Sequence, residues 1–503
     1  MPTHASPLRL PRWSLCLLLA ACNSQGGAPS PDGLPDLATG LARDASDPGG
    51  PADMARPSLV RYVKQIPDST NVDIIRGLAV DPSGNLYLGC MFSATVDFGD
   101  GPRVPHGNHD VAVVKLNPAG ELLWVRHFGS SEADTVLRVV SDHSGNVMVT
   151  GNFSTTLDFG AGPVNTHGKQ DLYLVKYAPD GRLVFGKAIG STEFEAAWAG
   201  LAVDASDNIY LGGAYGIVVG GTAPIDLGGG PLMSLGGADA FLVKYDPSGN
   251  HVFSKRLGGK YYDTLNAVAV AADGDILIGG QLMGTVDLGG GPVAPPAEAN
   301  NWGYVVRLSP SGAYKWAANY LTDGAGVYQL AIDASNRIDV AGTFVRSLQT
   351  RTSSLSSGNT GTHSFLLQLD ASGKETWARA LAPTSESDFP ELIHTDGDSV
   401  YVGGEFRGTA DFGFGNRTAA ENGGYLVRYS ATSAPLAMRQ YGGASFTSVH
   451  GVAHTADALY IGGYFEKSVQ FEDTTLTAKG QADGFLIKLA APVLPPSIAA
   501  HRR

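Results

Sequence analysis

The 503-residue chain lacks several features that mark common classes of protein. It has no cluster of basic residues and a formal net charge of −13, which argues against charge-driven binding to nucleic acid or anionic lipid. The apolar run near its N-terminus, Trp13 to Ala21, is too short to span a bilayer. No long stretch has the periodicity of an amphipathic helix. These absences favour an acidic protein built from strands and turns, as do its 66 glycines.

The N-terminus has the features of a targeting segment. Two arginines precede the apolar run, which ends in Leu19-Ala20-Ala21-Cys22. This ending resembles the lipobox of bacterial lipoproteins, in which the signal peptide is cleaved before the cysteine and the cysteine is acylated. The resemblance implies a signal peptide at 1–21, lipidation of Cys22 and anchoring in the cell envelope. The alternative is an ordinary secretory signal with a chance cysteine. Asn23 favours the outer membrane, because an aspartate there would signal retention at the inner membrane.

Cysteine is scarce, with three residues in the chain. Cys16 would leave with the signal peptide and Cys22 would carry lipid, so the mature fold would hold only Cys90 and no intramolecular disulfide. Cys90 occupies a position at which the other repeats described below have glycine. We therefore expect a small buried residue there rather than a reactive thiol.

The composition after the signal peptide divides the chain into three segments. Residues 22–57 are rich in Gly, Pro, Ala, Ser and Asp, which predicts a disordered tether with a reach of roughly 33 Å. Residues 58–490 hold a set of repeats, and residues 491–503 form a short C-terminal tail.

One motif recurs seven times in the repeat region. Its first copy contains LAVDPSGNLYLG, from Leu78 to Gly89, and successive copies end at Cys90, Gly151, Gly213, Gly280, Gly342, Gly404 and Gly463. A second motif, DVAVVKL in its first copy, and a third, LLWVRHFG, follow at the same period. All three are apolar or alternating runs bounded by Asp, Pro, Ser, Gly and Asn, which indicates strands joined by turns.

Each unit therefore predicts four antiparallel strands, here called a, b, c and d in chain order. Seven units of about sixty residues predict an all-β fold, a single seven-bladed β-propeller of four-stranded blades. The array begins with a d-type strand, LVRYVKQI, and ends with a c-type strand, DGFLIKL. We expect the N-terminal strand to complete the last blade, which closes the ring and removes a free sheet edge.

The repeats resemble the bacterial β-propeller repeats known as SBBP, whose units read like DAFVVKLDPSGN…W…FGG…VAVDSSGNVYVTG…TVDFGG. The resemblance covers about residues 58–489 and rests on linked motifs such as DAFLVKYDPSGN and VDFGDG. It implies a propeller fold and an extracytoplasmic location. It brings no catalytic residues to this chain.

Some side chains recur in nearly every unit and are expected to belong to the scaffold. Strand d carries a central aromatic residue in six of the seven units, and strand c carries a lysine or arginine in six. We expect the aromatics to pack between blades and the basic heads to reach the aspartates between b and c, which are Asp97, Asp158, Asp226, Asp287 and Asp411.

The sequence points to no metal or cofactor. His450 and His454 lie four residues apart on one strand, roughly 13 Å, which is too far to share an ion. His106 and His109 lie in a loop with one aspartate nearby, which does not make a convincing site.

The connections predict where function lies. The a–b and c–d turns share one face and are short, whereas the d–a and b–c loops share the other face and are long and variable, as functional loops usually are. Acidic residues recur in the d–a loops, and we predict that they form an acidic funnel on this long-loop face. The funnel residues are Asp73, Glu132, Asp134, Glu193, Glu195, Asp263, Asp323, Glu386 and Asp388. The alternative is that they are solvated turn residues with capping roles.

Two functions remain open. The first is a lipid-anchored binding or scaffold module for protein or glycan partners, with no role in binding nucleic acid. The second is a propeller enzyme, because LDASGKETWARAL looks like the tryptophan-containing repeats of quinoprotein dehydrogenases. Tryptophan fills its place in only three units and no vicinal cysteine pair is present, so the binding module is favoured.

Overall fold

The computed structural model describes residues 60–490, apart from 196–199, 218–222, 296–300, 321, 323 and 359–360. The predicted signal peptide, Cys22, the tether and the C-terminal tail lie outside the described residues. Within the described part, no helix is long and apolar enough to cross a membrane.

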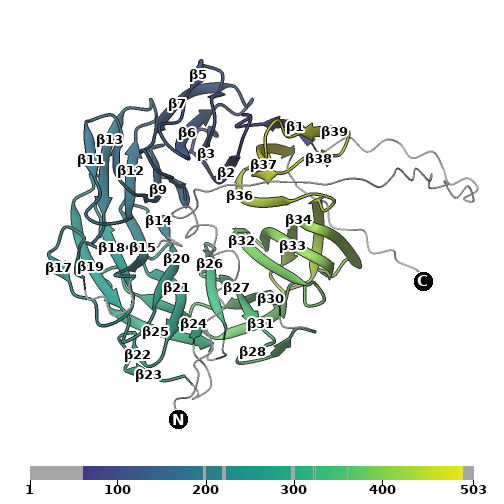
Figure 1. Ribbon diagram of the computed structural model, residues 1–503. Coiled ribbons are helices and arrows are strands. Elements are labelled where there is room, and N and C mark those ends of the chain that lie inside the picture. Colours follow the sequence, from purple (N-terminus) through teal and green to yellow (C-terminus); the bar gives the residue numbers. More distant parts are fainter. Residues whose placement is uncertain are drawn as a thin grey trace, which may run out of the picture. The chain divides into compact units, whose positions relative to one another are not determined.

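The described strands form seven four-stranded antiparallel sheets arranged in a ring, which confirms the predicted seven-bladed propeller (Figure 1). Blade 1 consists of β2 (Asp73–Val80), β3 (Leu86–Phe92), β6 (Asp110–Leu116) and β7 (Leu122–Phe128). Blade 2 consists of β8 (Arg138–Ser141), β9 (Val147–Phe153), β12 (Asp171–Tyr177) and β13 (Leu183–Ile189). Blade 3 consists of β14 (Leu201–Val203), β15 (Ile209–Tyr215), β18 (Asp239–Tyr245) and β19 (His251–Leu257).

The remaining blades repeat this order. Blade 4 consists of β20 (Thr264–Val270), β21 (Ile276–Met283), β24 (Asn301–Leu308) and β25 (Tyr314–Tyr320). Blade 5 consists of β26 (Gly326–Ile332), β27 (Ile338–Val345), β30 (Thr362–Leu369) and β31 (Glu375–Ala380). Blade 6 consists of β32 (Ser387–Asp396), β33 (Ser399–Asp411), β34 (Asn416–Ser430) and β35 (Pro435–Gly442).

The N-terminal strand completes the seventh blade, as the sequence predicts. Blade 7 consists of β36 (Thr447–Thr455), β37 (Ala458–Phe465), β40 (Asp483–Ala490) and β1 (Val60–Gln65). β1 pairs antiparallel with β40, with Val63 opposite Ile487. This pairing covers the outer edge of the last c strand and joins the two ends of the repeat array.

Most long b–c connections carry a small hairpin of their own. These hairpins are β4 (Val96–Asp97) with β5 (Pro102–Arg103), β10 (Thr156–Asp158) with β11 (Pro163–Asn165), β16 (Ile225–Asp226) with β17 (Pro231–Leu232), β22 (Val286–Asp287) with β23 (Pro292–Val293), β28 (Ser347–Gln349) with β29 (Ser354–Ser356), and β38 (Ser468–Phe471) with β39 (Thr474–Thr477). In blade 6 the same hairpin is a continuation of β33 and β34.

The hydrophobic core lies between neighbouring blades. Seven clusters of buried residues join successive pairs of blades within the described part, and the first combines Leu88 of blade 1 with Tyr460 of blade 7. The inner strands also contact one another around the ring, for example β2 with β8 and with β36. The apolar runs in strands b and c are thus explained, because both of their faces are covered by adjacent blades.

The recurring aromatics also join blades, as expected. The indole nitrogen of Trp124 in β7 donates to the carbonyl of Pro179 in the c–d turn of blade 2, at 2.9 Å. Trp316 and Trp377 make the same bond to the next blade. The d strand of each of these blades is therefore fastened to the turn of its neighbour.

The expected partner of the strand c lysines was wrong. Lys115 and Lys176 pair with Asp81 and Asp142 of the short a–b turns, at 3.1 and 2.9 Å, and all four side chains are buried. The aspartates between b and c instead accept backbone N–H groups of their own loops, as Asp97 does from Gly99 and Gly101. The reason is position. Lys115 and Lys176 are the next-to-last residues of strand c, at the end of the blade that carries the a–b turns, whereas the aspartates between b and c lie at the opposite end.

Candidate functional site

The long-loop face places the predicted funnel residues in two different environments. Five of them have side chains that are buried at the ends of their d–a loops: Asp73, Asp134, Glu195, Asp263 and Asp388. Each accepts hydrogen bonds from residues three or four positions earlier, as Asp263 does from the backbone N–H of Gly259 at 2.7 Å. Asp388 accepts from the Ser385 hydroxyl at 2.9 Å. These five carboxyls close their loops and do not line a solvent-filled funnel.

Burial changes the titration of these loop-closing carboxyls. It raises the pKa of Asp73 to about 6 and the pKa of Asp134, Glu195 and Asp263 to about 7, because the charged form loses water. The serine and backbone donors oppose this effect, since they stabilise the carboxylate. Desolvation outweighs the hydrogen bonds at all four positions.

The other predicted acids are more exposed, and two of them have basic partners. Glu193 pairs with Lys169 at 3.0 Å and Glu386 with Arg407 at 3.2 Å, while Glu132 is exposed. Asp323 lies outside the described residues. The nine acids therefore do not gather on one surface among the described residues, and ligand binding by the exposed acids stays a prediction.

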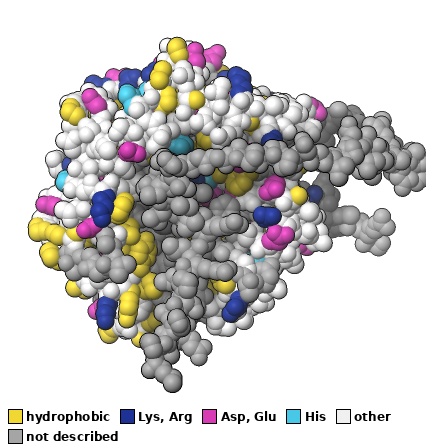
Figure 2. Space-filling view, in the orientation of Figure 1, with side chains coloured by type: hydrophobic (Ala, Val, Ile, Leu, Met, Phe, Trp, Pro, Cys, Tyr) yellow, Lys and Arg dark blue, Asp and Glu magenta, His cyan; other side chains and the backbone are white. Residues whose placement is uncertain are grey.

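The same face carries a group of exposed apolar side chains that the sequence did not single out. We define the loop-face patch as Phe194, Met233, Leu235, Tyr261 and Tyr262, whose exposed fractions range from 37% to 57%. Met233 and Leu235 follow β17 in the b–c loop of blade 3, and the two tyrosines lie in the d–a loop that leads to blade 4. Figure 2 shows hydrophobic side chains gathered over this part of the ring.

Backbone hydrogen bonds hold the segments of the loop-face patch side by side. The N–H of Ala238 donates to the carbonyl of Tyr261 at 3.2 Å, and the N–H of Asp263 donates to Ala238 at 2.9 Å. On the other side, the N–H of Ile217 in the b–c loop donates to the carbonyl of Phe194 at 3.0 Å. The patch is thus built on paired loops and supported by the closing carboxylate of Asp263.

The lysines next to this patch lie over its rings. Lys169 stands 5.1 Å from the centre of the Phe194 ring, and Lys260 stands 5.8 Å from the centre of the Tyr261 ring. Such cation–π contacts keep a flat aromatic face oriented without covering it completely. The sequence does not show that the rings of Tyr261 and Tyr262 face solvent, because tyrosines near strand ends are more often buried.

A second polar group lies on the inner strands of blades 6, 7, 1 and 2. Arg76, Glu391 and His450 each stand at a register shift in an inner strand, which is the position of a β-bulge. Arg76 Nη1 lies 2.9 Å from His450 Nδ1, which lies 3.4 Å from Glu391 Oε2. The His450 ring also stacks on Tyr464, with centroids 5.3 Å apart. The sequence did not identify this group, because its members come from separate repeats.

Glu391 of this inner-strand group and Glu405 on the adjacent strand β33 have pKa values that lie far apart. His450, Arg76 and Arg138 outweigh the effect of burial and lower the pKa of Glu391 to about 2. Burial and the nearby charge of Glu391 raise the pKa of Glu405 to about 8. Glu405 accepts a hydrogen bond from the Asn422 amide at 3.2 Å. One carboxyl is therefore ionised and the other is mostly protonated at neutral pH.

Comparison with known proteins gives few sequence relatives. No protein-family model matches the chain. It is 25% identical over 393 residues to the regulatory protein FlaEY of Caulobacter vibrioides, which covers 71% of this chain and 39% of that protein. It is 24% identical over 119 residues to an uncharacterized WD repeat-containing protein of Acanthamoeba polyphaga mimivirus, which covers 21% and 8%. Both matches span well under two thirds of the relative.

Two solved structures show a distant likeness to the chain. The polysaccharide lyase Uly1 aligns with 83% of this chain and 90% of its own, at 9% identity and a TM-score of 0.44. The phage phi92 endosialidase aligns with 88% of this chain and 70% of its own, at 10% identity and a TM-score of 0.39. Such low values transfer no activity to this chain, and its fold follows from its own strand topology: a seven-bladed β-propeller.

Proposed function

We propose that this protein is a lipid-anchored, extracytoplasmic propeller of the SBBP type that binds a protein partner through its loop-face patch. The lipobox-like ending at Cys22 supports the anchor, and the repeat motifs support the SBBP assignment. The distribution of exposed apolar side chains carries the binding proposal. Five of the ten large apolar side chains that are exposed among the described residues lie in this patch.

The chemistry of the patch favours a protein over a glycan. Met233 and Leu235 are exposed and have no polar group with which to recognise a sugar hydroxyl. Tyrosine, phenylalanine and methionine are enriched in protein interfaces, and tyrosine is among the residues that most often carry a large share of the binding free energy. An apolar patch rimmed by lysines and acids is also a common form of such an interface.

Site-specific cross-linking in the native envelope tests the proposal. A photo-reactive side chain at position 233 or 261 should capture the same protein, whereas one at Val252, an exposed apolar position on the d strand of blade 3, should not. Met233→Asp with Tyr261→Asp should abolish capture while the circular dichroism spectrum stays unchanged. Capture from all three positions, or from none, would contradict a specific site on this patch; glycan binding that the double variant loses would identify a glycan instead.

The anchor has a separate test. Cys22→Ser should remove incorporation of labelled fatty acid and release the protein from the membrane fraction. A serine variant that stays acylated and membrane-bound would exclude lipidation at this residue.

Catalysis on the inner strands is the second candidate, in keeping with the alternative of a propeller enzyme. A pair of carboxyls whose pKa values lie far apart can divide general-acid and general-base roles, and Glu391 and Glu405 form such a pair. The test is hydrolysis of a panel of polysaccharides and glycosides. An enzyme would be supported by turnover that is abolished by Glu391→Gln and also by Glu405→Gln. Turnover that neither substitution reduces would exclude this pair.

A further inference from the structure

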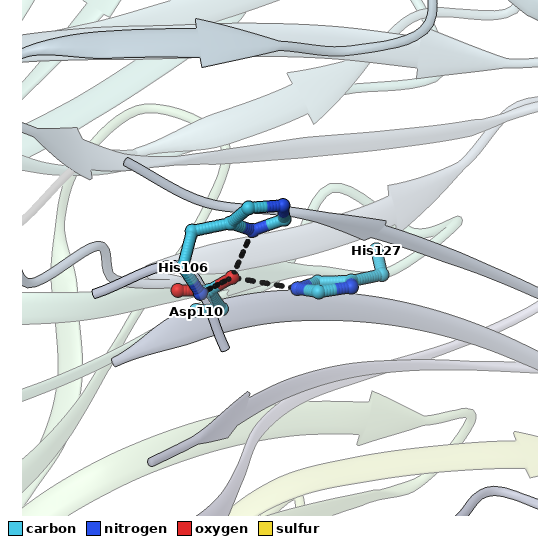
Figure 3. Close-up of side chains that lie close together, drawn as sticks. All are labelled: His106, Asp110 and His127. Carbon is cyan, nitrogen blue, oxygen red and sulfur yellow. Dashed lines mark hydrogen bonds and ion pairs between the residues drawn. The ribbon is translucent and has the colours of Figure 1, made fainter. Parts of the chain in front are cut away.

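Blade 1 brings two imidazoles onto one buried carboxylate. His106 Nδ1 and His127 Nε2 lie 2.7 and 2.6 Å from the same oxygen of Asp110, Oδ2 (Figure 3). The three groups come from different elements: His106 from the loop before β6, Asp110 from the first position of β6, and His127 from β7. Their ligand atoms all lie within 4.8 Å of one another.

Strand register explains why residues 17 positions apart meet here. Ala112 lies opposite His127 in the β6–β7 hairpin, so Asp110, two residues earlier, is a diagonal neighbour on the same face. Asp110 also accepts the backbone N–H of His106 at 2.9 Å and that of Gly107 at 3.2 Å, which turns the loop and places the His106 ring over the carboxylate. The carboxylate is thus fixed by hydrogen bonds before any ligand arrives.

The other blades show what the fold itself requires at this position. In blade 2, Asp171 accepts the backbone N–H and the Nδ1 of His167, both at 2.7 Å, and the residue in the place of His127 is Ala188. In blade 7, Asp483 has Gln65 in that place, which donates to it. The fold therefore accepts Ala or Gln at this position, even though Oδ1 of Asp171 and of Asp483 is left buried without a hydrogen-bond partner, and it does not require the second imidazole of blade 1.

We propose that His106, Asp110 and His127 form a binding site for a divalent transition metal ion, of which Zn²⁺ is the best fit. Two imidazole nitrogens and one carboxylate oxygen are typical ligands of Zn²⁺, with water as the fourth. At metal–ligand distances of about 2.0–2.2 Å, ligand atoms stand about 3.3 Å apart. Each imidazole nitrogen therefore has to move roughly half an ångström away from Oδ2, and the two nitrogens, now within 4.8 Å of each other, have to settle at the same spacing. The ion replaces the two N–H protons that now face Oδ2.

The solvent exposure of His106 and the hydrogen bonds that hold Asp110 are both suited to a bound ion. The His106 side chain is 58% exposed and gives an ion and its water a path from solvent, whereas the side chains of Asp110 and His127 are 0% and 10% exposed. The backbone N–H groups that bond Asp110 act as the outer hydrogen bonds that orient ligating carboxylates in metal sites.

Zinc titration of the full chain, purified without a histidine tag and stripped with chelator, tests the site. We expect one Zn²⁺ per chain and a thermal midpoint that rises with zinc concentration. His127→Gln, which copies blade 7 and keeps a donor to Asp110, should weaken zinc binding at least tenfold while leaving the metal-free midpoint nearly unchanged. His167→Ala should bind zinc as the native chain does.

A gain-of-site variant provides an independent check. Ala188→His should give blade 2 the same three groups and raise the stoichiometry to two ions per chain; a folded variant that still binds one ion would count against the geometry. A second histidine pair could also bind zinc, because His394 Nε2 lies 3.1 Å from His454 Nδ1. The experiment therefore has to distinguish binding at this pair from binding at the blade 1 site. Zinc binding that His454→Gln abolishes and His127→Gln leaves intact, or no zinc binding at 100-fold excess, would overturn the proposal.

Discussion

At the scale of single residues, the last glycine of the repeated motif is explained by close backbone contact. A Cβ added at Gly280 would lie 2.0 Å from the carbonyl oxygen of Thr264, and one at Gly463 would lie 2.0 Å from that of Ser448. These contacts are with backbone and cannot be relieved by rotating a side chain. Cys90 fills the same place in blade 1 and is fully buried, which confirms the expected small buried residue.

We predict that Gly280→Ala destabilises the protein by about 1–3 kcal/mol or more, because the new methyl group forces the inner hairpin of blade 4 apart. Cys90→Ala is the matched control, since blade 1 already accommodates a Cβ there, and it should cost no more than about 1 kcal/mol. Urea denaturation measures both. Equal effects of the two substitutions would contradict the backbone-contact explanation.

At the scale of elements, an ion pair between strand c and the a–b turn ties the inner hairpin to its sheet in blades 1 to 4. Lys176 Nζ lies 2.9 Å from Asp142 Oδ2, and neither side chain is more than 3% exposed. Lys176→Met leaves a buried carboxylate without its cation and should cost about 3–5 kcal/mol. Adding Asp142→Asn should recover a large part of that loss, as chemical denaturation of the single and double variants would show. A double variant no more stable than Lys176→Met would exclude the uncompensated charge as the cause.

Ring closure is the other element-scale feature. A chain that begins at residue 67 lacks β1, so β40 loses its outer partner and blade 7 presents a bare edge. Compared with a chain that begins at residue 58, we expect a lower thermal midpoint and concentration-dependent association in light scattering. Equal midpoints and monomeric behaviour for both chains would show that β1 is dispensable.

At the scale of the whole molecule, stability depends on buried carboxyls that hold their protons. Folded-state pKa values of about 7 for Asp134 and Asp263 and about 8 for Glu405 lie above the ordinary values near 4. The folded state then binds more protons than the unfolded chain, so the stability from these groups is complete below about pH 4 and is lost as the pH rises through 7 and 8. Acids with lowered pKa values, such as Glu391, are ionised in both states above pH 5 and do not oppose this trend.

We therefore predict that the free energy of unfolding falls between about pH 6.5 and 8.5. Histidines with lowered pKa values, such as His394 at about 4, gain stability only up to the ordinary value near 6.5, so they offset a small part of the fall at the lower end of this window. The expected decrease is on the order of 2–4 kcal/mol. Glu405→Gln should remove roughly half of it, because the amide stays neutral throughout. Urea denaturation at a series of pH values measures the slope, and a slope that is flat or rises with pH would contradict the buried protonated acids.

The sequence alone determined the scaffold. Alternation of apolar residues, turn residues at fixed offsets and the mismatched ends of the array are local signals, and they predicted seven blades closed by β1 because each blade repeats the same short-range pattern.

Only the tertiary structure decided which side chains meet and which face solvent. Asp134 and Glu132 are two residues apart in one loop, yet one closes the loop in the interior and the other is exposed. The loop-face patch, the inner-strand group and the three ligands of blade 1 join residues from different loops, strands or blades. Their proximity depends on strand register and ring closure, which a linear pattern does not encode side chain by side chain.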